Sequence, residues 1–383
     1  MTVSSSVFRV AARRAQNLGQ VRGIQALAAV YTETGDPQSV LRVVRHDLPP
    51  MLDNQVMVQM LAAPVNPSDL NQIEGTYPVR GTSNQISSNG TSFQACVGGN
   101  EGVGRVAQVG QNVDNVQVGD WVVPQRAGEF GTWCTRTVVD AQSVSVVPEE
   151  WRSGLSPLDV ACLKVNPCTA YRLLRDFADL QKGDYVIQNG ANSGVGRAVI
   201  QLARHWGIRT INVVRDRPEL DKLQHELTAL GADIVVSDKQ LSSDSVKQHI
   251  RSLDARVRLG FNCVGGRSTL QLTKYISEGG TLVSYGGMSR QPVTMPTSLL
   301  LFKDIAARGF WMNRWYNSCT NTAMDVERQN MWKCVLELMQ CGMFVTQPLS
   351  VSSIDEANEA DAQRIVRDAV SWSTGSKHAF VFA

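Results

Sequence analysis

Residues 184–217 read DYVIQNGANSGVGRAVIQLARHWGIRTINVVRDR, and this stretch decides the fold. Tyr185–Gln188 form a short apolar run that predicts a strand, and the run is then broken by three glycines, Gly190, Gly194 and Gly196. Apolar residues recur at helical spacing after the glycines until Gly207, so we predict a helix that ends there. The β-branched run Arg209–Val214 predicts a second strand. Strand, glycine turn, helix and strand therefore follow one another without a gap.

The glycine turn has the chemistry of a dinucleotide site. Glycines let the backbone approach a pyrophosphate, and a helix that begins there points unpaired N–H groups and its positive dipole end at the anion. The spacing G-x-x-x-G-x-G differs from the commonest pattern, G-x-G-x-x-G, so the glycines alone are weak evidence.

The end of the second strand favours NADPH over NADH. An NAD-preferring site places Asp or Glu about 20 residues after the turn, where it accepts hydrogen bonds from the ribose hydroxyls. Here the strand ends in Arg215, Asp216 and Arg217. Two guanidinium groups suit a 2′-phosphate, which Arg binds through a planar, charge-assisted fork. Asp216 keeps NADH open, and a glycine-rich helix start followed by solvated arginines is the alternative without a cofactor.

Length and composition indicate an enzyme of about two domains. The chain has 383 residues, of which 43% are hydrophobic and 19% charged, as is typical of a soluble enzyme. No apolar run reaches the roughly 18 residues of a membrane span, so we expect none, and we expect no nucleic-acid partner. The eight cysteines include no C-x-x-C pair, which favours reduced thiols in a protein that is not secreted.

The N-terminal segment differs in charge from the rest. Residues 1–32 hold four arginines and no acid, which leaves 33 basic residues against 35 acidic ones beyond them. A segment rich in Arg, Ser and Ala that lacks a long apolar core is typical of a mitochondrial transit peptide, which we place at residues 1–27. A disordered basic tail is the alternative.

The remaining chain is predicted to form two nested domains. Short strands and turns over residues 28–163 predict a compact, partly open β-barrel, with a polar loop after Pro64 and a mobile surface excursion over residues 81–97. From residue 184 the strand-helix unit repeats, which predicts a doubly wound, six-stranded parallel Rossmann sheet. We therefore predict a β-rich catalytic domain, 28–163 and 324–383, around a Rossmann NADPH-binding domain, 164–323. This order puts a cleft at their junction.

The cleft is predicted to hold no metal. The chain has five histidines, and none is paired with another His or a Cys at ligand spacing. Tyr77 is then the best candidate for an acid, because it follows a barrel strand. A phenol with a pKa of about 10 stays protonated at neutral pH and can donate a proton to a carbanion or enolate. By residue type alone, a loop tyrosine is more often a packing residue.

Eight strings over the chain resemble one family: VNPSDLNQIEGTYP, GGNEGVG, GDWVVP, VNPCTAYR, VIQNGANSGVG, RTINVVRDRP, NCVGG and TLVSYGGM. They resemble the mitochondrial trans-2-enoyl-CoA reductases, also called enoyl-acyl-carrier-protein reductases, which belong to the zinc-free part of the medium-chain dehydrogenase/reductase superfamily. The resemblance runs from about residue 28 to the C-terminus. It implies a GroES-like fold for the β-rich domain and a location in the mitochondrial matrix.

The resemblance also implies roles for single residues. Asn66 and Asn100 stand where zinc-dependent relatives place a Cys and a His ligand, and Tyr77 matches the catalytic tyrosine. The residues that match cofactor contacts are Asn166 near the nicotinamide; Asn192, Ser193, Gly194 and Val195 at the pyrophosphate turn; Arg215, Asp216 and Arg217 at the 2′-phosphate; Tyr285, Gly286, Gly287, Met288, Phe310, Trp311 and Met312 in the cleft; and Lys377. The link from Tyr77 to Gly98 is longer than is usual in the family, so the shape of the substrate entrance is not carried over.

The implied reaction is the reduction of a trans-2-enoyl thioester by NADPH, with the acyl group carried on CoA or acyl carrier protein. It is the last reductive step of mitochondrial fatty acid synthesis. Tyr77 would donate a proton to the α-carbon or a hydrogen bond to the thioester oxygen. A homodimer through the edge of the parallel sheet is implied as well. Because acyl carrier protein is acidic, Arg80, Arg308 and Arg314 are candidates for steering it. An NADPH-dependent quinone oxidoreductase and a non-catalytic NADPH-binding regulatory protein remain alternatives.

Overall fold

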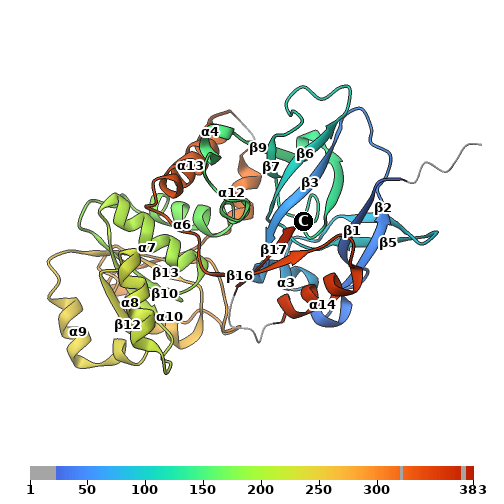
Figure 1. The fold of residues 1–383 in the computed structure, drawn as a ribbon. Helices are drawn as coiled ribbons and strands as arrows, with labels where there is room; N and C mark the ends of the chain where they lie inside the picture. The colour runs from blue at the N-terminus through green and yellow to red at the C-terminus, as the bar shows by residue number, and fades with distance from the viewer. Residues whose placement is uncertain (1–22, 320–321, 372–376) are drawn as a thin grey trace, which may run out of the picture.

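The structure, a computed structural model, describes residues 23–319, 322–371 and 377–383. An α/β half built from the middle of the chain lies beside a β-rich half built from segments near both ends (Figure 1). Of the expected transit peptide, residues 1–22 lie outside the described residues, whereas Gln25–Leu27 already pair within the first strand.

The α/β half contains a parallel sheet in the order β12-β11-β10-β13-β14-β15. Its strands are β10 (Tyr185–Asn189), β11 (Arg209–Val214), β12 (Ile234–Ser237), β13 (Val257–Asn262), β14 (Thr281–Ser284) and β15 (Ala306–Gly309). The connecting helices are α7 (Gly194–Trp206), α8 (Leu220–Leu230), α9 (Asp244–Arg251), α10 (Gly266–Thr273) and α11 (Thr297–Phe302). This arrangement confirms the predicted doubly wound sheet. The strand order reverses beside β10, and such sheets bind ligands at the carboxyl ends of the strands at that point.

Helix α7 is held at both ends by residues visible in the sequence. The Oγ atom of Ser193 accepts a hydrogen bond from the backbone N–H of Gly196 at 3.1 Å, which caps the first turn. Gly207 ends the helix with a φ of 72°, a left-handed conformation that glycine adopts without steric cost. Val199 and Leu202 are fully buried in the same apolar cluster as Val186 of β10. This packing fixes the glycine turn against the sheet.

The β-rich half contains a barrel and a larger sheet. The barrel consists of β1 (Gln25–Tyr31), β2 (Arg42–Asp47), β4 (Ser83–Ser88) and β5 (Thr91–Val97). The sheet has the order β16-β17-β3-β6-β7-β9, with β8 paired to β3. Its strands are β3 (Gln55–Pro64), β6 (Val103–Val109), β7 (Trp121–Pro124), β8 (Arg136–Asp140), β9 (Val144–Val147), β16 (Leu349–Ile354) and β17 (Lys377–Phe382).

The prediction of a mobile excursion over residues 81–97 is wrong. These residues form a hairpin of β4 and β5, paired from Ser83 opposite Cys96 to Ser88 opposite Thr91. Asn89 and Gly90 form its turn with φ values of 50° and 76°, the left-handed conformations that a tight two-residue turn requires. The hairpin closes the barrel through β1 and β2 and projects away from the α/β half (Figure 1). The Asn-Gly pair was the sequence signal for this turn, but the polar strands hid it.

The polar segment after Pro64 is also more ordered than the predicted loop. It contains helix α3 (Pro67–Ile73), which starts with proline at its first position. The Asp69 carboxylate accepts a hydrogen bond from the backbone N–H of Asn66 at 2.8 Å, which satisfies a donor at the helix start. The prolines and asparagines of this segment favour a loop in the sequence analysis, but in the structure they lie at the start of a helix and within it.

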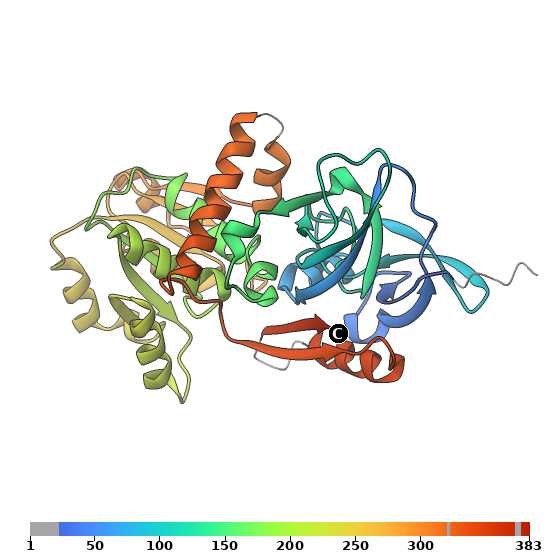
Figure 2. The ribbon, with the colours of Figure 1, turned by 45° about the horizontal axis from the view of Figure 1, so that its top comes forward.

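The C-terminal segment returns to the β-rich half (Figure 2). Helix α13 (Thr322–Gln340) packs along α4 (Glu149–Arg152) and α6 (Asn166–Arg175). Strand β17 then pairs antiparallel with β3, so that Ala379 lies opposite Pro64 and Val65 donates its N–H to the His378 carbonyl at 2.9 Å. The remaining helices are α2 (Pro37–Val40), α5 (Pro157–Ala161), α12 (Met312–Ser318) and α14 (Glu359–Ala369). The last strand therefore fixes the entry to α3.

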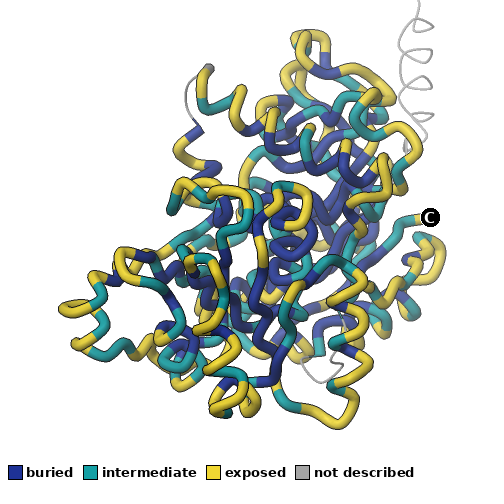
Figure 3. Tube along the Cα trace, turned by 90° about the vertical axis from the view of Figure 1, so that its left-hand side faces the viewer, coloured by how far each residue is buried: buried dark blue, intermediate teal, exposed yellow. Residues whose placement is uncertain are grey.

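One apolar core joins the two halves. It includes Val103 of β6, Leu173 of α6, Phe261 of β13 and Trp332 of α13, all buried. Figure 3 shows the buried segments running through the middle of the molecule, with exposed turns around them. Among the described residues, no helix combines the length and apolar character needed to cross a bilayer.

Candidate active site

A cavity of ≈ 780 Å³ lies at the junction of the two halves. Ligand pockets in proteins measure roughly 300–1,000 Å³, so its size suits a small-molecule site. Its walls bring together twelve of the residues singled out in the sequence: Asn66, Tyr77, Asn100, Asn166, Val195, Tyr285, Gly286, Gly287, Met288, Phe310, Trp311 and Met312. No residue of the β4–β5 hairpin lines it. The longer link between Tyr77 and Gly98 therefore adds no hairpin residue to the cavity wall.

Tyr77 lies in the cavity wall with its hydroxyl held from one side. Its Oη atom accepts a hydrogen bond from Trp311 Nε1 at 2.7 Å and a longer one from Asn313 Nδ2 at 3.4 Å. The two aromatic rings meet edge to face, with centroids 5.9 Å apart. Because both neighbours donate, the phenolic proton is left to point at a ligand. Burial raises the pKa of Tyr77, and the negative charge of Asp69 raises it further, so the phenol is protonated at neutral pH.

The loop that carries Tyr77 folds back on α3. The backbone N–H groups of Thr76 and Tyr77 both donate to the carbonyl of Asn71, at 2.9 and 3.2 Å. Gly75 allows this reversal, with a φ of 79°. The position of the phenol is therefore set by the helix and not by a free loop.

A buried polar network lies behind Tyr77, and we call it the amide-carboxylate network: Asn66, Asp69, Gln72, Asn100 and Glu101, all buried. Asn66 Nδ2 donates to Glu101 Oε2 at 2.8 Å, and Asn100 Nδ2 donates to Asp69 Oδ1 at 2.8 Å and to Gln72 Oε1 at 2.9 Å. Glu101 also accepts the backbone N–H of Val165 at 2.7 Å, just before α6. The network thus connects α3 to the start of α6, which carries Asn166.

The network does not suit a zinc ion. The side-chain nitrogens of Asn66 and Asn100 donate to carboxylates, so they offer no lone pair to a metal. Within the described ranges, no group of three or more His, Cys, Asp and Glu side chains could hold a metal ion. Burial raises the pKa of Asp69 to about 6 and also raises that of Glu101. The amide donors oppose both shifts by stabilising the ionised forms.

The floor of the cavity contains a buried lysine. Lys164 Nζ donates to the carbonyls of Pro124 and Gln125, the latter at 3.2 Å, and lies 4.8 Å from the ring centroid of Tyr316. Burial lowers the pKa of Lys164 to about 8. Its carbonyl accepts the hydroxyl of Tyr316 at 3.1 Å. These contacts occupy the ammonium group and hold the floor rigid.

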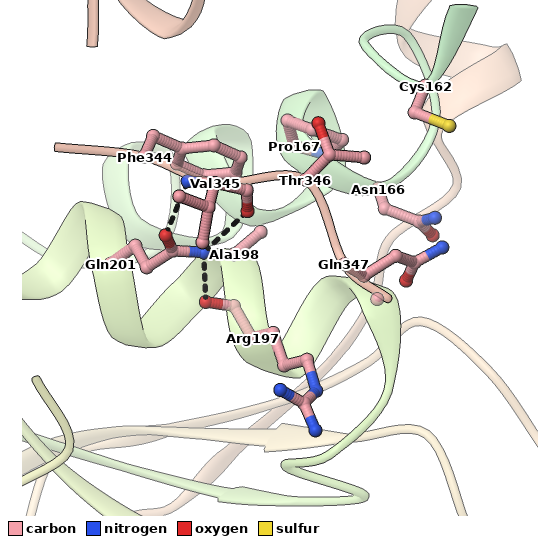
Figure 4. A pocket seen from close by; sticks show the side chains of 11 residues that line it. Cys162, Asn166, Pro167, Arg197, Ala198, Gln201, Phe344, Val345, Thr346 and Gln347 are labelled. Carbon is pink, nitrogen blue, oxygen red and sulfur yellow. Dashed lines mark hydrogen bonds between the residues drawn. The ribbon is translucent and has the colours of Figure 1, made fainter. Parts of the chain in front are cut away.

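The glycine turn at the start of α7 packs against a segment that approaches from the C-terminal side (Figure 4). Gln201 of α7 clamps Val345, since its Oε1 accepts the Val345 N–H at 2.7 Å and its Nε2 donates to the Val345 carbonyl at 3.2 Å. Gln347 thereby comes beside Asn166, and a side chain at Gly194 would collide with both. Glycine at this position therefore leaves room for the side chains of Gln347 and Asn166 as they stand, with Asn192 and Ser193 directly before it.

The charged residues at the end of β11 lie outside the cavity. Arg215 and Arg217 are exposed. Asp216 forms an ion pair with Lys239 at 2.6 Å, and its backbone N–H donates to Asp238 at 3.1 Å. Sequence reasoning missed Lys239, because only the fold brings it beside Asp216.

Lys377 also lies outside the cavity wall, as the first residue of β17. Its Nζ atom is buried and has no hydrogen-bond partner among the described residues. Burial raises the pKa of Glu101, and the charge of Lys377 opposes that shift, so the lysine lies near the amide-carboxylate network.

Two family models match the chain. The model described as "Alcohol dehydrogenase GroES-like domain" matches residues 52–149, and that described as "Zinc-binding dehydrogenase" matches residues 194–339. Asn66 and Asn100 fall within the range of the first of these models.

Individual proteins give a narrower likeness. The mitochondrial enoyl-acyl-carrier-protein reductase of Xenopus tropicalis is 43% identical over 342 residues, which cover 88% of this chain and 93% of that protein. A solved complex of Etr1p with NADP and crotonyl-CoA is 32% identical, with a TM-score of 0.85, over 94% of this chain and all of that one. The Etr1p/Etr2p heterodimer, a mitochondrial 2-enoyl thioester reductase from Candida tropicalis, matches with the same TM-score, identity and coverage.

Proposed function

The chain belongs to the family of mitochondrial enoyl-acyl-carrier-protein reductases, and from this premise we propose how its cavity performs the reaction. The protein is a mitochondrial, NADPH-dependent reductase of enoyl thioesters that serves fatty acid synthesis. The observation that carries the proposed mechanism is the Tyr77 hydroxyl, which accepts Trp311 Nε1–H and so keeps its own proton for the substrate.

The residues of the cleft fit the cofactor. Asn66 lines the cavity, and its Oδ1 atom is a buried acceptor without a hydrogen-bond partner in the described part of the chain, as a site for a carboxamide N–H donor would have. The turn Asn192–Val195 would hold the pyrophosphate, and Arg215 and Arg217 the 2′-phosphate. The bound NADPH supplies a hydride to the β-carbon of the enoyl thioester.

Tyr77 has the properties of the proton donor in this reduction. Hydride addition leaves negative charge shared between the α-carbon and the thioester oxygen, and a neutral phenol can donate to either. Two effects keep the phenol neutral before the reaction, namely its burial and the nearby charge of Asp69. The amide-carboxylate network supports this geometry, because Glu101 ties α3 to the segment that leads into Asn166.

We further infer that the protein forms a homodimer through the edge of the parallel sheet. Strand β15 is an edge strand with all four residues exposed, and α11 next to it exposes Leu300, Leu301 and Phe302. An exposed strand edge beside an apolar helix suits pairing with a second copy. Such a dimer would cover Arg308, and Arg80 and Arg314 would then be the candidates for steering an acidic carrier protein.

A direct spectrophotometric assay of NADPH oxidation tests the proposed function. Purified protein with NADPH should lose absorbance of the reduced cofactor on addition of crotonyl-CoA, and much less on addition of a quinone. A faster reaction with the quinone would favour a quinone oxidoreductase. Cofactor binding without turnover of either substrate would favour a binding protein. Sedimentation of the same sample tests the homodimer, since a monomer at micromolar concentration would contradict it.

A further inference from the structure

One ion pair crosses the mouth of the cavity. Arg290 lies in the loop after β14, and Glu74 ends α3, three residues before Tyr77. Arg290 Nη2 and Glu74 Oε2 are 3.2 Å apart. The arginine side chain is 74% exposed, whereas that of the glutamate is 18% exposed. The pair therefore joins the cofactor loop to the Tyr77 loop at the solvent boundary.

Arg290 is the charge that this cavity offers to an anionic ligand. Among the described residues that line it, Lys164 and Arg290 are charged and none is acidic. Lys164 Nζ is buried and donates to two backbone carbonyls, so it is already used. The Arg290 side chain is exposed and has one ion pair, with Glu74, and ion pairs that solvent reaches contribute little to stability. The Arg290 guanidinium can therefore leave Glu74 and bind an anionic ligand that forms stronger hydrogen bonds with it.

The loop holds Arg290 in position without fixing its side chain. Ser289 donates its N–H to the Val264 carbonyl at 2.9 Å, and the Arg290 N–H donates to the Gly287 carbonyl at 2.9 Å. Arg290 has a φ of 57°, a left-handed conformation that is unfavourable for a residue with a side chain. Such backbone strain persists where the surroundings impose it and is concentrated at ligand-binding sites.

We propose that Arg290 binds the phosphate of the pantetheine arm shared by CoA and acyl carrier protein, and that Glu74 holds the arginine in place until a thioester arrives. This inference rests on the proposed function, since it names how the carrier part of the same substrate is recognised. Arg binds phosphate through two parallel charge-assisted hydrogen bonds, which are stronger than an exposed ion pair. Arg290 would therefore distinguish thioesters by the phosphate that they carry.

The experiment compares two thioesters of the same acyl group. Crotonyl-CoA carries phosphate on its pantetheine arm, and crotonyl-N-acetylcysteamine carries none. In Arg290→Gln, the ratio of kcat/KM for crotonyl-CoA to that for the cysteamine thioester should fall by about tenfold. In Glu74→Gln the same ratio should rise by about twofold to threefold, because the competing carboxylate is lost. Arg290→Lys should lower the ratio by less than Arg290→Gln, because it keeps the charge but not the two parallel hydrogen bonds. Arg267→Gln, at an exposed arginine of α10, should not change it.

Three results would overturn the proposal. An unchanged ratio in Arg290→Gln would show that the arginine does not contact the carrier. If kcat/KM falls equally for both thioesters in a variant whose thermal unfolding is unchanged, the ion pair serves to hold the two halves together and does not bind the carrier. An increase in the KM for NADPH by the same factor would assign the phosphate to the cofactor. Turnover of the cysteamine thioester by the unaltered enzyme supports the proposed function in all three cases, and its absence together with that of crotonyl-CoA would overturn both proposals.

Discussion

The two ends of the proposed cofactor site are built in opposite ways. At the Tyr77 end, Asn66, Asp69 and Glu101 are buried, and Asn66 donates a hydrogen bond of 2.8 Å to each of the two carboxylates. At the β11 end, Arg215 and Arg217 are exposed, and Asp216 is paired with an exposed Lys239. Proton transfer needs a fixed donor, whereas charge recognition works with side chains that become ordered on binding. Changes at the buried end should therefore affect turnover and stability, and changes at the exposed end should affect cofactor choice.

The largest expected effect comes from Tyr77→Phe. The ring and its packing on Trp311 remain, but the proton donor is lost, so turnover of crotonyl-CoA should fall by about 100-fold or more. The dissociation constant for NADPH should stay unchanged in a fluorescence titration. Full turnover in this variant would show that Tyr77 is not the proton donor. The buried end of the site would then not differ from the exposed end in its effect on turnover.

The second effect is a pH dependence of stability. Burial raises the pKa of Asp69 to about 6, against about 3.9 in an unfolded chain, so the folded protein binds more protons between these values. The free energy of unfolding should thus fall as pH rises from about 4 to about 6, by on the order of 2–3 kcal/mol. Urea unfolding measures this, and Asp69→Asn should lose that part of the slope. Equal slopes in both proteins would contradict the assignment.

The third effect is the loss of a link between the halves in Glu101→Gln. The amide would face one of two donors, Asn66 Nδ2 or the Val165 N–H, with its own NH₂ group. An unsatisfied buried donor costs about 2 kcal/mol, so the melting temperature and the turnover should both fall. Glu278→Gln, at an exposed position, is the matched control. If the two variants behave alike, the network carries no positioning role.

The smallest effect is expected at the exposed end. Replacing Arg215 and Arg217 together by Ala should raise the KM for NADPH by about tenfold and leave that for NADH unchanged. Lys239→Ala should raise the KM for NADPH by only about twofold, because Lys239 acts by neutralising Asp216. An equal rise in KM for NADPH and NADH would contradict a 2′-phosphate site. A lower melting temperature of the variant would show that the exposed end also contributes to stability.

The sequence revealed what is encoded locally. The unit from Tyr185 to Val214 was predictable because strand, turn and helix signals adjoin one another. The β4–β5 hairpin was not, since its strands are polar and mostly exposed, and the Asn-Gly turn was the remaining signal. The contact between Tyr77 and Trp311 joins residues 234 positions apart, and that between Asn66 and Glu101 joins residues 35 positions apart. The spacing of apolar residues along the sequence does not indicate such long-range contacts.

The pairing of β17 with β3 makes the β-rich half depend on a strand that follows the whole six-stranded sheet in the sequence. Until Lys377–Phe382 emerge, the stretch before α3 has no neighbouring strand on that side, whereas the six strands around α7 are already complete. A protein shortened by one strand would thus keep its nucleotide half and still lack a properly held phenol. The order of the elements in the chain therefore lets the nucleotide half form before the segment that carries the phenol is complete.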